Sequence, residues 1–228
     1  MKAATLALFD LDYTLLDGDS EELWARHLFQ QGVVDAAFVD RIEVFYRDYE
    51  LGILNFNAYE QFLLGPLAVL PADRLFDLRA DYLKAIQMLV RPKMLERVEW
   101  HRRERCEIVM ITASNSFLAE PIARMLGFAN LICTQVETEN GQFTGRTRNV
   151  PAFQYGKVIR LAEWMREKGL GLAGSWCYSD SYNDLPLLEL VDHAVMVTPD
   201  MKLRQKGVER GWELLEIPAS VSVESWRE

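Results

Sequence analysis

Two aspartates, two residues apart, follow the first apolar run of the chain in the stretch LALFDLDYT at residues 6–14. Asp10 ends the run, and Asp12 comes directly after Leu11. Because residues i and i+2 of an extended segment face the same way, both carboxylates can point into one site. Neighbouring carboxylates at the end of a buried strand repel each other and resist desolvation. A hard cation such as Mg²⁺, which takes one or two carboxylates together with phosphate and water, would offset that repulsion.

Alternating strands and helices, from about residue 92 onwards, must position these acids. We expect strands at 106–112, 129–136, 175–180, 193–199 and 212–217, helices at 115–128, 156–169, 183–191 and 199–211, and a hairpin at 136–147. This order predicts an α/β fold with a mainly parallel, Rossmann-like sheet that is covered on both faces. Ligands bind such sheets at the carboxyl ends of the strands. Three apolar runs end there in polar pairs: Asp10 and Asp12, Thr112 and Ser114, and Asp180 and Asp184.

Residues 20 to about 90 have a different pattern. Apolar residues recur there at helical spacing, and no strong strand signal interrupts them. We therefore expect an all-helical insertion between the first and second strands. The predicted domains are a core formed by residues 1–19 and 91–228 and a helical cap formed by residues 20–90.

Four short motifs, in order along the chain, resemble those of the haloacid dehalogenase-like phosphatases, in particular the branch that includes phosphoserine phosphatase. They are Asp-x-Asp-x-Thr in FDLDYT, a Thr after an apolar strand in IVMITAS, a Lys that opens a helix in QYGKV, and Ser-Asp-x-x-x-Asp in YSDSYND. Ser179 stands where many relatives have Gly, so a small residue remains. The resemblance covers nearly the whole chain and includes the helical insertion after the first motif.

The resemblance implies a phosphomonoester hydrolase that works through an aspartyl-phosphate. Asp10 would be the nucleophile, and Asp12 would act first as the general acid and then as the general base. The implied cofactor is Mg²⁺, held by the carboxylates of Asp10 and Asp180 and by the backbone carbonyl of Asp12.

The resemblance also assigns the phosphate-binding and supporting groups. Thr112 and Lys157 would hold the phosphate oxygens, together with backbone N–H groups near Leu11, Asp12 and Ala113. Asp184 would orient Lys157 and the water around the metal, with Asn183 beside it.

Other polar residues near these motifs have structural interpretations. Ser114 precedes a predicted helix and is expected to be its N-cap. Asp17 and Asp19 are expected to be mainly structural, near the mouth of the cavity. The three histidines share no metal-ligand spacing, so no zinc site is expected; they are His27, His101 and His193.

Substrate selection is expected to depend on the cap. Arg47 is the candidate contact if the substrate carries a carboxylate, as phosphoserine does. A substrate with an amine, such as histidinol phosphate, would instead favour acids; the candidates are Glu21, Glu43 and Asp48. The sequence holds both kinds of residue and leaves the choice open.

The composition limits the partners. With 25 Lys and Arg against 34 Asp and Glu, the net charge of −9 gives no general attraction to nucleic acid or to an anionic membrane. No apolar run reaches the ~18 residues of a membrane span.

Three cysteines far apart in sequence predict free thiols and a reducing, cytoplasmic setting; they are Cys106, Cys133 and Cys177. We expect a small phosphate ester as the binding partner, and a monomer or a homodimer.

Three other functions share parts of this pattern. A phosphotransferase or mutase would use the same aspartyl-phosphate. A non-catalytic signalling domain would accept a phosphoryl group on Asp10 and keep it, and Asp12 and the large insertion argue against this. A binding or scaffold protein would need none of the catalytic positions, all of which are present here.

Overall fold

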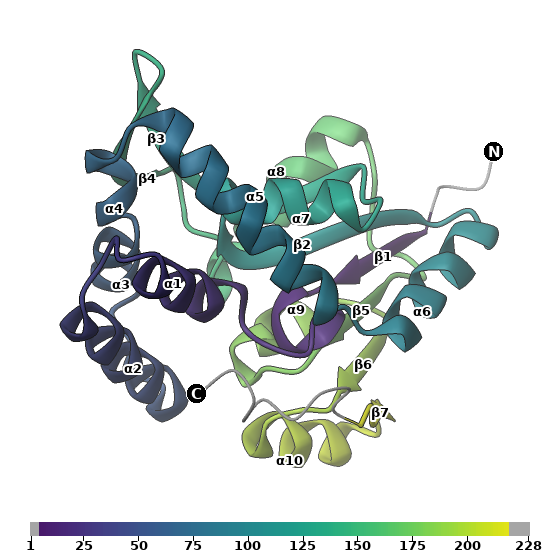
Figure 1. Cartoon of the computed structure of the whole chain (residues 1–228). Helices are drawn as coiled ribbons and strands as arrows, with labels where there is room; N and C mark the ends of the chain where they lie inside the picture. The colour runs from purple at the N-terminus through teal and green to yellow at the C-terminus, as the bar shows by residue number, and fades with distance from the viewer. Residues whose placement is uncertain (1–4, 219–228) are drawn as a thin grey trace.

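The computed structural model describes residues 5–218 of the chain, and seven strands form one sheet in the order β4-β3-β2-β1-β5-β6-β7. The strands are β1 (Leu6–Phe9), β2 (Glu107–Asn115), β3 (Asn130–Glu139), β4 (Gln142–Arg148), β5 (Trp176–Ser179), β6 (His193–Val197) and β7 (Glu213–Leu215). Neighbouring strands are parallel except β3 and β4, which form an antiparallel hairpin. The sheet confirms the predicted α/β fold, and β1 lies in its middle (Figure 1).

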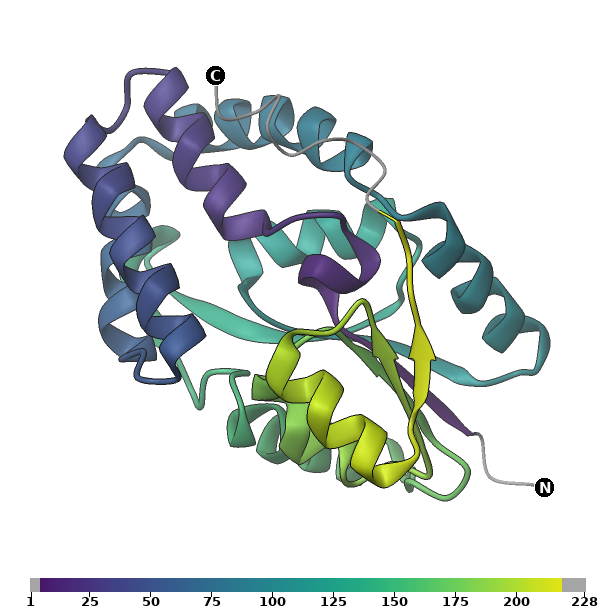
Figure 2. The same ribbon diagram turned by 90° about the horizontal axis from the view of Figure 1, so that it is seen from below.

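Ten α-helices connect and cover the strands in the described part of the chain. They are α1 (Ser20–Gln30), α2 (Ala36–Leu51), α3 (Phe56–Leu63), α4 (Gly65–Val69), α5 (Ala72–Met88), α6 (Pro92–Arg103), α7 (Ser116–Met125), α8 (Tyr155–Lys168), α9 (Leu185–Leu188) and α10 (Met201–Arg210). In Figure 2 the green α8 and the yellow α10 lie on one side of the sheet, and the blue-green α6 and α7 lie on the other.

Alternate side chains of β1 belong to the two hydrophobic cores on opposite faces of the sheet. Ala7 and Phe9 pack in the core that includes α5, α6 and α7, whereas Leu6 and Leu8 pack in the core that includes α8, α9 and α10. All four side chains are fully buried, as expected for the central strand of a sheet covered on both faces. The carboxyl end of β1 is therefore held rigidly from both sides.

The helices α1 to α5 form an insertion between β1 and α6, and Figure 1 shows α1 to α4 beyond the carboxyl end of β1. The chain leaves and rejoins the core through two connections that lie side by side. Leu16 and Val90 form an antiparallel bridge, and the backbone N–H of Arg91 donates to the carbonyl of Leu15 at 2.9 Å. The insertion thus begins and ends at neighbouring points of the core.

The structure corrects two predicted boundaries. The strand expected at 106–112 is β2, which continues to Asn115 because Asn115 pairs with Thr134 of β3 beyond a bulge. As a result, Asn115 and not Ser114 is the N-cap of α7, and its Oδ1 accepts from the N–H of Leu118 at 3.3 Å. The helix expected at 183–191 is a single turn at 182–184 followed by the four-residue α9.

Other expectations concern the hairpin, the cysteines and the surface. The hairpin of β3 and β4 turns at Asn140 and Gly141, whose φ angles are 51° and 80°.

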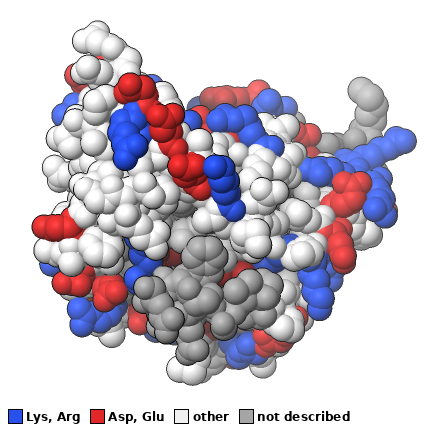
Figure 3. Space-filling model, viewed as in Figure 1, with Lys and Arg blue, Asp and Glu red and all other residues white. Residues whose placement is uncertain are grey.

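All three cysteines are free; Cys133 and Cys177 are buried, and Cys106 is partly exposed. Within residues 5–218 no helix has the length and apolar character needed to span a membrane. On the face seen in Figure 3, acidic and basic side chains are interspersed.

Candidate active site

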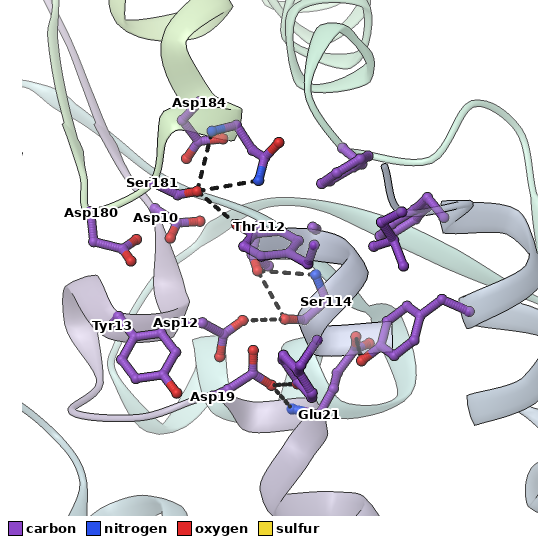
Figure 4. A pocket seen from close by; sticks show the side chains of 18 of the residues that line it. Asp10, Asp12, Tyr13, Asp19, Glu21, Thr112, Ser114, Asp180, Ser181 and Asp184 are labelled. Carbon is purple, nitrogen blue, oxygen red and sulfur yellow. Dashed lines mark hydrogen bonds between the residues drawn. The ribbon is translucent and has the colours of Figure 1, made fainter. Parts of the chain in front are cut away.

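A tight loop at the carboxyl end of β1 carries the first two candidate residues. The backbone N–H of Asp10 donates to the carbonyl of Tyr178 in β5 at 3.0 Å, which continues the pairing of β1 with β5. The chain then turns sharply at Tyr13, whose φ of 51° lies in the left-handed region. The N–H of Tyr13 donates to the carbonyl of Gly18 at 3.1 Å, and this bond closes the loop. Figure 4 shows the side chains of Asp10 and Asp12 pointing into one pocket.

Lys157, at the start of α8, joins the first and fourth motifs. Its Nζ lies 2.7 Å from Oδ1 of Asp10 and 2.7 Å from Oδ2 of Asp184. All three side chains are buried, with Lys157 and Asp184 each 3% exposed and Asp10 7%. Ser179 also donates to Oδ2 of Asp184, at 2.8 Å. Lys157 is therefore fixed between two carboxylates with its ammonium group beside the candidate nucleophile.

Burial and neighbouring charges shift the pKa values of Asp10 and Lys157. Burial, and then the neighbouring carboxylates Asp184 and Asp12, raise the pKa of Asp10 to about 7, although Lys157 opposes the shift. Burial disfavours the ammonium of Lys157, but the attraction of Asp10 and Asp184 is larger and raises its pKa. Lys157 is thus a permanent positive charge at this position.

The structure around Lys157 depends on a close approach of two backbone segments. A Cβ atom on Gly156 would lie 1.9 Å from the carbonyl oxygen of Pro151, so only glycine fits there. Two residues earlier, Gln154 has a φ of 49°, and its side chain donates to Oδ1 of Asn183 at 2.7 Å. The loop 149–154 is therefore packed tightly against the fourth motif.

Asp180 follows β5 and is the second acid that could hold a metal. Burial, and then the charges of Asp10 and Asp184, raise its pKa well above the ordinary value. Among the described residues, no three His, Cys, Asp or Glu side chains are grouped in a way that could hold a metal ion. Two carboxylates, Asp10 and Asp180, still suit Mg²⁺, which keeps several waters and needs few protein ligands. Because the charge of Asp10 raises the pKa of Asp180, a divalent cation between the two carboxylates would relieve their repulsion.

The second motif places hydroxyl groups opposite these acids. Thr112 and Ser114 lie at the carboxyl end of β2, and both are almost fully buried. Thr112 Oγ1 donates to Ser114 Oγ at 3.0 Å, and Ser114 Oγ donates to Oδ2 of Asp12 at 2.5 Å. Burial raises the pKa of Asp12, while the hydrogen bond from Ser114 lowers it.

A cavity of about 310 Å³ extends from these groups towards the helical insertion. Its charged lining consists of eight acids and one base, which are Asp10, Asp12, Asp19, Glu21, Glu50, Asp180, Asp184 and Asp200 with Lys157. Its aromatic lining consists of Tyr13, Phe45, Tyr46, Tyr49, Phe56, Tyr59 and Phe153. No arginine and no histidine lines it among the described residues.

Three contacts around the opening of the cavity join the insertion to the core. Phe56 of α3 stacks on Phe153 of the loop 149–154, with ring centroids 4.5 Å apart and planes 6° apart. The hydroxyls of Tyr49 and Ser181 are 2.7 Å apart. Lys202 of α10 donates to the backbone carbonyl of Glu50 at 2.8 Å. These contacts enclose the cavity between α2, α3 and the ends of the strands.

Two acids at the start of α1 lie where the insertion begins. Oδ1 of Asp19 accepts from the N–H groups of Glu21 and Glu22 and from the hydroxyl of Tyr46, so Asp19 is the N-cap of α1. The side chain of Asp19 lines the cavity. Within residues 5–218 no group donates a hydrogen bond to its other oxygen, Oδ2. Glu21 is more fully bonded, because it accepts from Asn115 and from Tyr59.

Most residues singled out from the sequence meet at this cavity. Its lining includes Asp10, Asp12, Thr112, Ala113, Lys157, Asp180, Asn183 and Asp184. Leu11 is fully buried and is not in the lining. Arg47 is exposed on α2 and does not reach the cavity, so the structure gives no support to a contact between Arg47 and the substrate. Of the three acids considered for an amine, only Glu21 lines the cavity; Glu43 is exposed and pairs with Arg26.

Several lining residues were not predicted from the sequence. On α2 they are Phe45, Tyr46 and Tyr49, whose helical spacing places them on one face and could have revealed them. Phe153 and Ser181 carry no comparable signal, because they lie in irregular loops.

Comparison with known proteins identifies the family. The haloacid dehalogenase-like hydrolase profile matches residues 7–189, and the chain belongs to this family. A histidinol-phosphatase of Neisseria meningitidis is 38% identical over 216 residues, which cover 92% of this chain and 97% of the relative. A phosphoserine phosphatase of Mycobacterium tuberculosis is 31% identical over 220 residues, which cover 91% of this chain and 69% of the relative. In line with its family and these relatives, the protein is a phosphatase.

Solved structures agree with the fold. A protein of unknown function from Bordetella pertussis Tohama I superposes with a TM-score of 0.87 and 35% identity, covering 94% of this chain and 99% of that one. A phosphoserine phosphatase captured as a phospho-aspartyl intermediate analogue superposes with a TM-score of 0.71 and 17% identity, covering 94% of each chain. At 17% identity, the similarity to the phosphoserine phosphatase structure shows a shared fold and nothing more.

Proposed function

We propose that the protein is a Mg²⁺-dependent phosphomonoesterase that hydrolyses a small phosphate ester, with an amine and no carboxylate, through an aspartyl-phosphate on Asp10. The observation that carries the proposal is the position of Asp10. It lies at the end of the central strand, 2.7 Å from the ammonium of Lys157, in a cavity that also contains Asp12 and Asp180. A carboxylate so placed can approach the phosphorus atom of a phosphate group, once neighbouring cations offset the negative charge of the phosphate oxygens.

In the first half of the reaction, Oδ of Asp10 bonds to phosphorus as the bond from phosphorus to the leaving oxygen breaks. Asp12 gives its proton to that oxygen, so the alcohol leaves neutral and Asp12 becomes a carboxylate. In the second half, Asp12 takes a proton from water while the water oxygen bonds to phosphorus. As that bond forms, the bond from phosphorus to Asp10 breaks, which releases phosphate and restores both side chains.

Other residues hold the reacting groups in place. Thr112, Lys157 and Ala113 line the cavity. In this proposal Thr112 and Lys157 bind phosphate oxygens, together with the backbone N–H of Ala113. Mg²⁺ bound by Asp10, Asp180 and the carbonyl of Asp12 would supply positive charge to the phosphate. Asp184 keeps Lys157 in position through its 2.7 Å contact, with Asn183 beside it. The insertion, residues 20–90, acts as a cap that limits access of water.

The charge of the lining supports an amine-bearing substrate. Apart from Lys157, which already contacts two carboxylates, no basic residue lines the cavity in the described part of the chain. A substrate carboxylate, as in phosphoserine, would therefore meet acids, aromatic rings and Leu54 at the cap, and no basic residue. An ammonium or imidazolium group would find the open Oδ2 of Asp19 and aromatic faces, which attract cations. The 38% identical relative is named a histidinol-phosphatase, and histidinol phosphate carries both kinds of group.

A panel of phosphate esters tests the proposal. We would measure kcat/KM with Mg²⁺ for histidinol phosphate, phosphoethanolamine, phosphoserine and glycerol phosphate, and would assay transfer to added alcohols. We expect histidinol phosphate to exceed phosphoserine by at least ~30-fold, since one misplaced charge at a buried site costs at least ~2 kcal/mol. Free phosphate should be the main product. A preference for phosphoserine would contradict the substrate class, and a transferred phosphoryl group as the main product would indicate a phosphotransferase.

Two substitutions separate the chemistry from the specificity. Asp10→Asn should abolish hydrolysis of every ester, including p-nitrophenyl phosphate, because it removes the nucleophile. Asp19→Asn should lower kcat/KM for histidinol phosphate but leave p-nitrophenyl phosphate nearly unchanged. Glu43→Gln is the matched control, because Glu43 is an exposed acid of α2 outside the cavity. Full activity of Asp10→Asn would show that the nucleophile is assigned wrongly.

A further inference from the structure

The hydroxyl of Ser114 lies among three other oxygen atoms. It is 2.5 Å from Oδ2 of Asp12, 3.0 Å from Oγ1 of Thr112 and 3.1 Å from Oγ of Ser20. Ser114 is 2% exposed, so almost all of its side chain is enclosed by these and neighbouring groups. Figure 4 shows the bonds that link Asp12, Ser114 and Thr112 at the wall of the cavity.

The direction of each hydrogen bond follows from the available protons. A serine hydroxyl has one proton and can accept two bonds, whereas a carboxyl oxygen that carries no proton only accepts. Ser114 therefore donates to Asp12 and accepts from Thr112. Thr112 Oγ1 in turn accepts from the backbone N–H of Ser114 at 3.1 Å. The chain of bonds begins at a backbone N–H, passes through two hydroxyls and ends at the carboxylate of Asp12.

The other oxygen of Asp12 is held from a different part of the protein. Its Oδ1 accepts from the backbone N–H of Ser20 at 2.7 Å, at the first residue of α1. One donor thus comes from the end of β2 in the core, and the other comes from the start of the insertion. Two donors on two oxygens fix both the position and the rotation of the carboxylate.

We propose that Ser114 is a positioning residue for Asp12, and that its hydroxyl holds the Asp12 carboxylate where it exchanges protons with the leaving oxygen and with water. The inference rests on the proposed function, in which Asp12 is the general acid and base. It differs from the helix-capping role expected from the sequence, because Asn115 supplies the cap of α7. A displacement of about 1 Å in a reacting group can cost ~10²-fold in rate, so this support matters for the reaction.

The test compares two esters that differ in their need for an acid. Histidinol phosphate has a poor alkoxide leaving group, whereas p-nitrophenolate leaves without a proton. With enzyme in excess over ester, a single turnover reports release of the leaving group alone. We expect Ser114→Ala to slow this step ~10–100-fold for histidinol phosphate and less than ~3-fold for p-nitrophenyl phosphate. The inhibition constant of inorganic phosphate should not change, because Lys157 and Thr112 remain.

Ser175→Ala is the matched control. Ser175 is a fully buried serine outside the cavity, and its hydroxyl has no hydrogen-bond partner among the described residues. We expect less than ~3-fold change with either ester, since no bond to Asp12 is lost. Thermal unfolding verifies that each variant is folded. If Ser114→Ala does not fold, Ser114→Cys, which has nearly the same shape and a weak donor, carries the same comparison.

The possible results separate this inference from the proposed function. Equal slowing of both esters by Ser114→Ala, or no slowing of either, would overturn the positioning role. Asp12→Asn should slow histidinol phosphate at least as much as Ser114→Ala does. If Asp12→Asn keeps the wild-type rate with histidinol phosphate, the assignment of Asp12 itself fails. If Asp12→Asn is slow and Ser114→Ala is not, only the role of Ser114 fails.

Discussion

The ion pair of Asp17 and Arg91 joins the two connections between the insertion and the core, and we expect its removal to destabilise the protein strongly. Nη2 of Arg91 lies 2.9 Å from Oδ1 of Asp17, and the two side chains are 5% and 7% exposed. Nη1 of Arg91 also donates to the backbone carbonyl of Tyr13 at 2.7 Å. One guanidinium thus holds an acid of the outgoing connection and the turn of the loop that carries Asp10 and Asp12.

The expected magnitude follows from burial. Removing one partner of a buried, hydrogen-bonded ion pair costs ~3–5 kcal/mol. Here the change also removes the bond from Arg91 to the carbonyl of Tyr13. For a chain of this length, each kcal/mol lowers the unfolding temperature by ~2–4 °C. Arg91→Met keeps the apolar stem and removes the charge, so we expect it to lower the unfolding temperature by ~6–20 °C.

Urea unfolding, followed by circular dichroism at pH 7, measures the free energy of unfolding directly. Arg26→Met is the matched control, because Arg26 pairs with Glu22 at the same 2.9 Å but both side chains are about a quarter exposed. A surface pair of this kind contributes ~0–1 kcal/mol. The reasoning is refuted if Arg91→Met costs no more than Arg26→Met.

Three further predictions concern packing, pH and metal. Gly156→Ala should greatly reduce activity and folded yield, because its Cβ would lie 1.9 Å from the carbonyl oxygen of Pro151; Gly171→Ala, with open space around it, should not. Burial lowers the pKa of His101 to about 4, so the stability it contributes is complete above pH ~6.5 and is lost as the pH falls towards 4. Thermal unfolding across this range should therefore depend less on pH in His101→Gln than in the wild type. Removal of divalent ions by EDTA should abolish activity, and Mg²⁺ should restore it and raise the unfolding temperature; Asp180→Asn should lose that rise in temperature.

Features with a local sequence signal were predicted from the sequence. The apolar run before Asp10 and the alternation of strands and helices indicated the parallel sheet, and the sheet in turn brings Asp10, Thr112 and Asp180 to one edge. Confirmation of the family supports the four-motif interpretation. The hairpin at Asn140 and Gly141 was predictable because both residues tolerate a positive φ.

The remaining features depend on contacts between distant segments. Arg47 was chosen for its charge, but the helical phase of α2 turns it away from the face that carries Tyr46 and Tyr49. Ser114 was interpreted from its local position before a helix, while its bond to Asp12 joins residues 102 apart in sequence. The pairing of Asp17 with Arg91 spans 74 residues, and no local pattern indicates it.

The bridge between Leu16 and Val90 also bears on how such a chain can evolve. Because the outgoing and returning segments leave the core as neighbours at Leu16 and Val90, the 73 residues between them begin and end at one place. Lengthening a segment whose ends are already adjacent changes its closure entropy only slowly, by about 0.6 kcal/mol per doubling. Insertions, deletions or wholesale exchange of this unit can therefore accumulate without disturbing strand order. Residues of this insertion can in this way change during evolution, while the residues at the carboxyl ends of the strands stay the same.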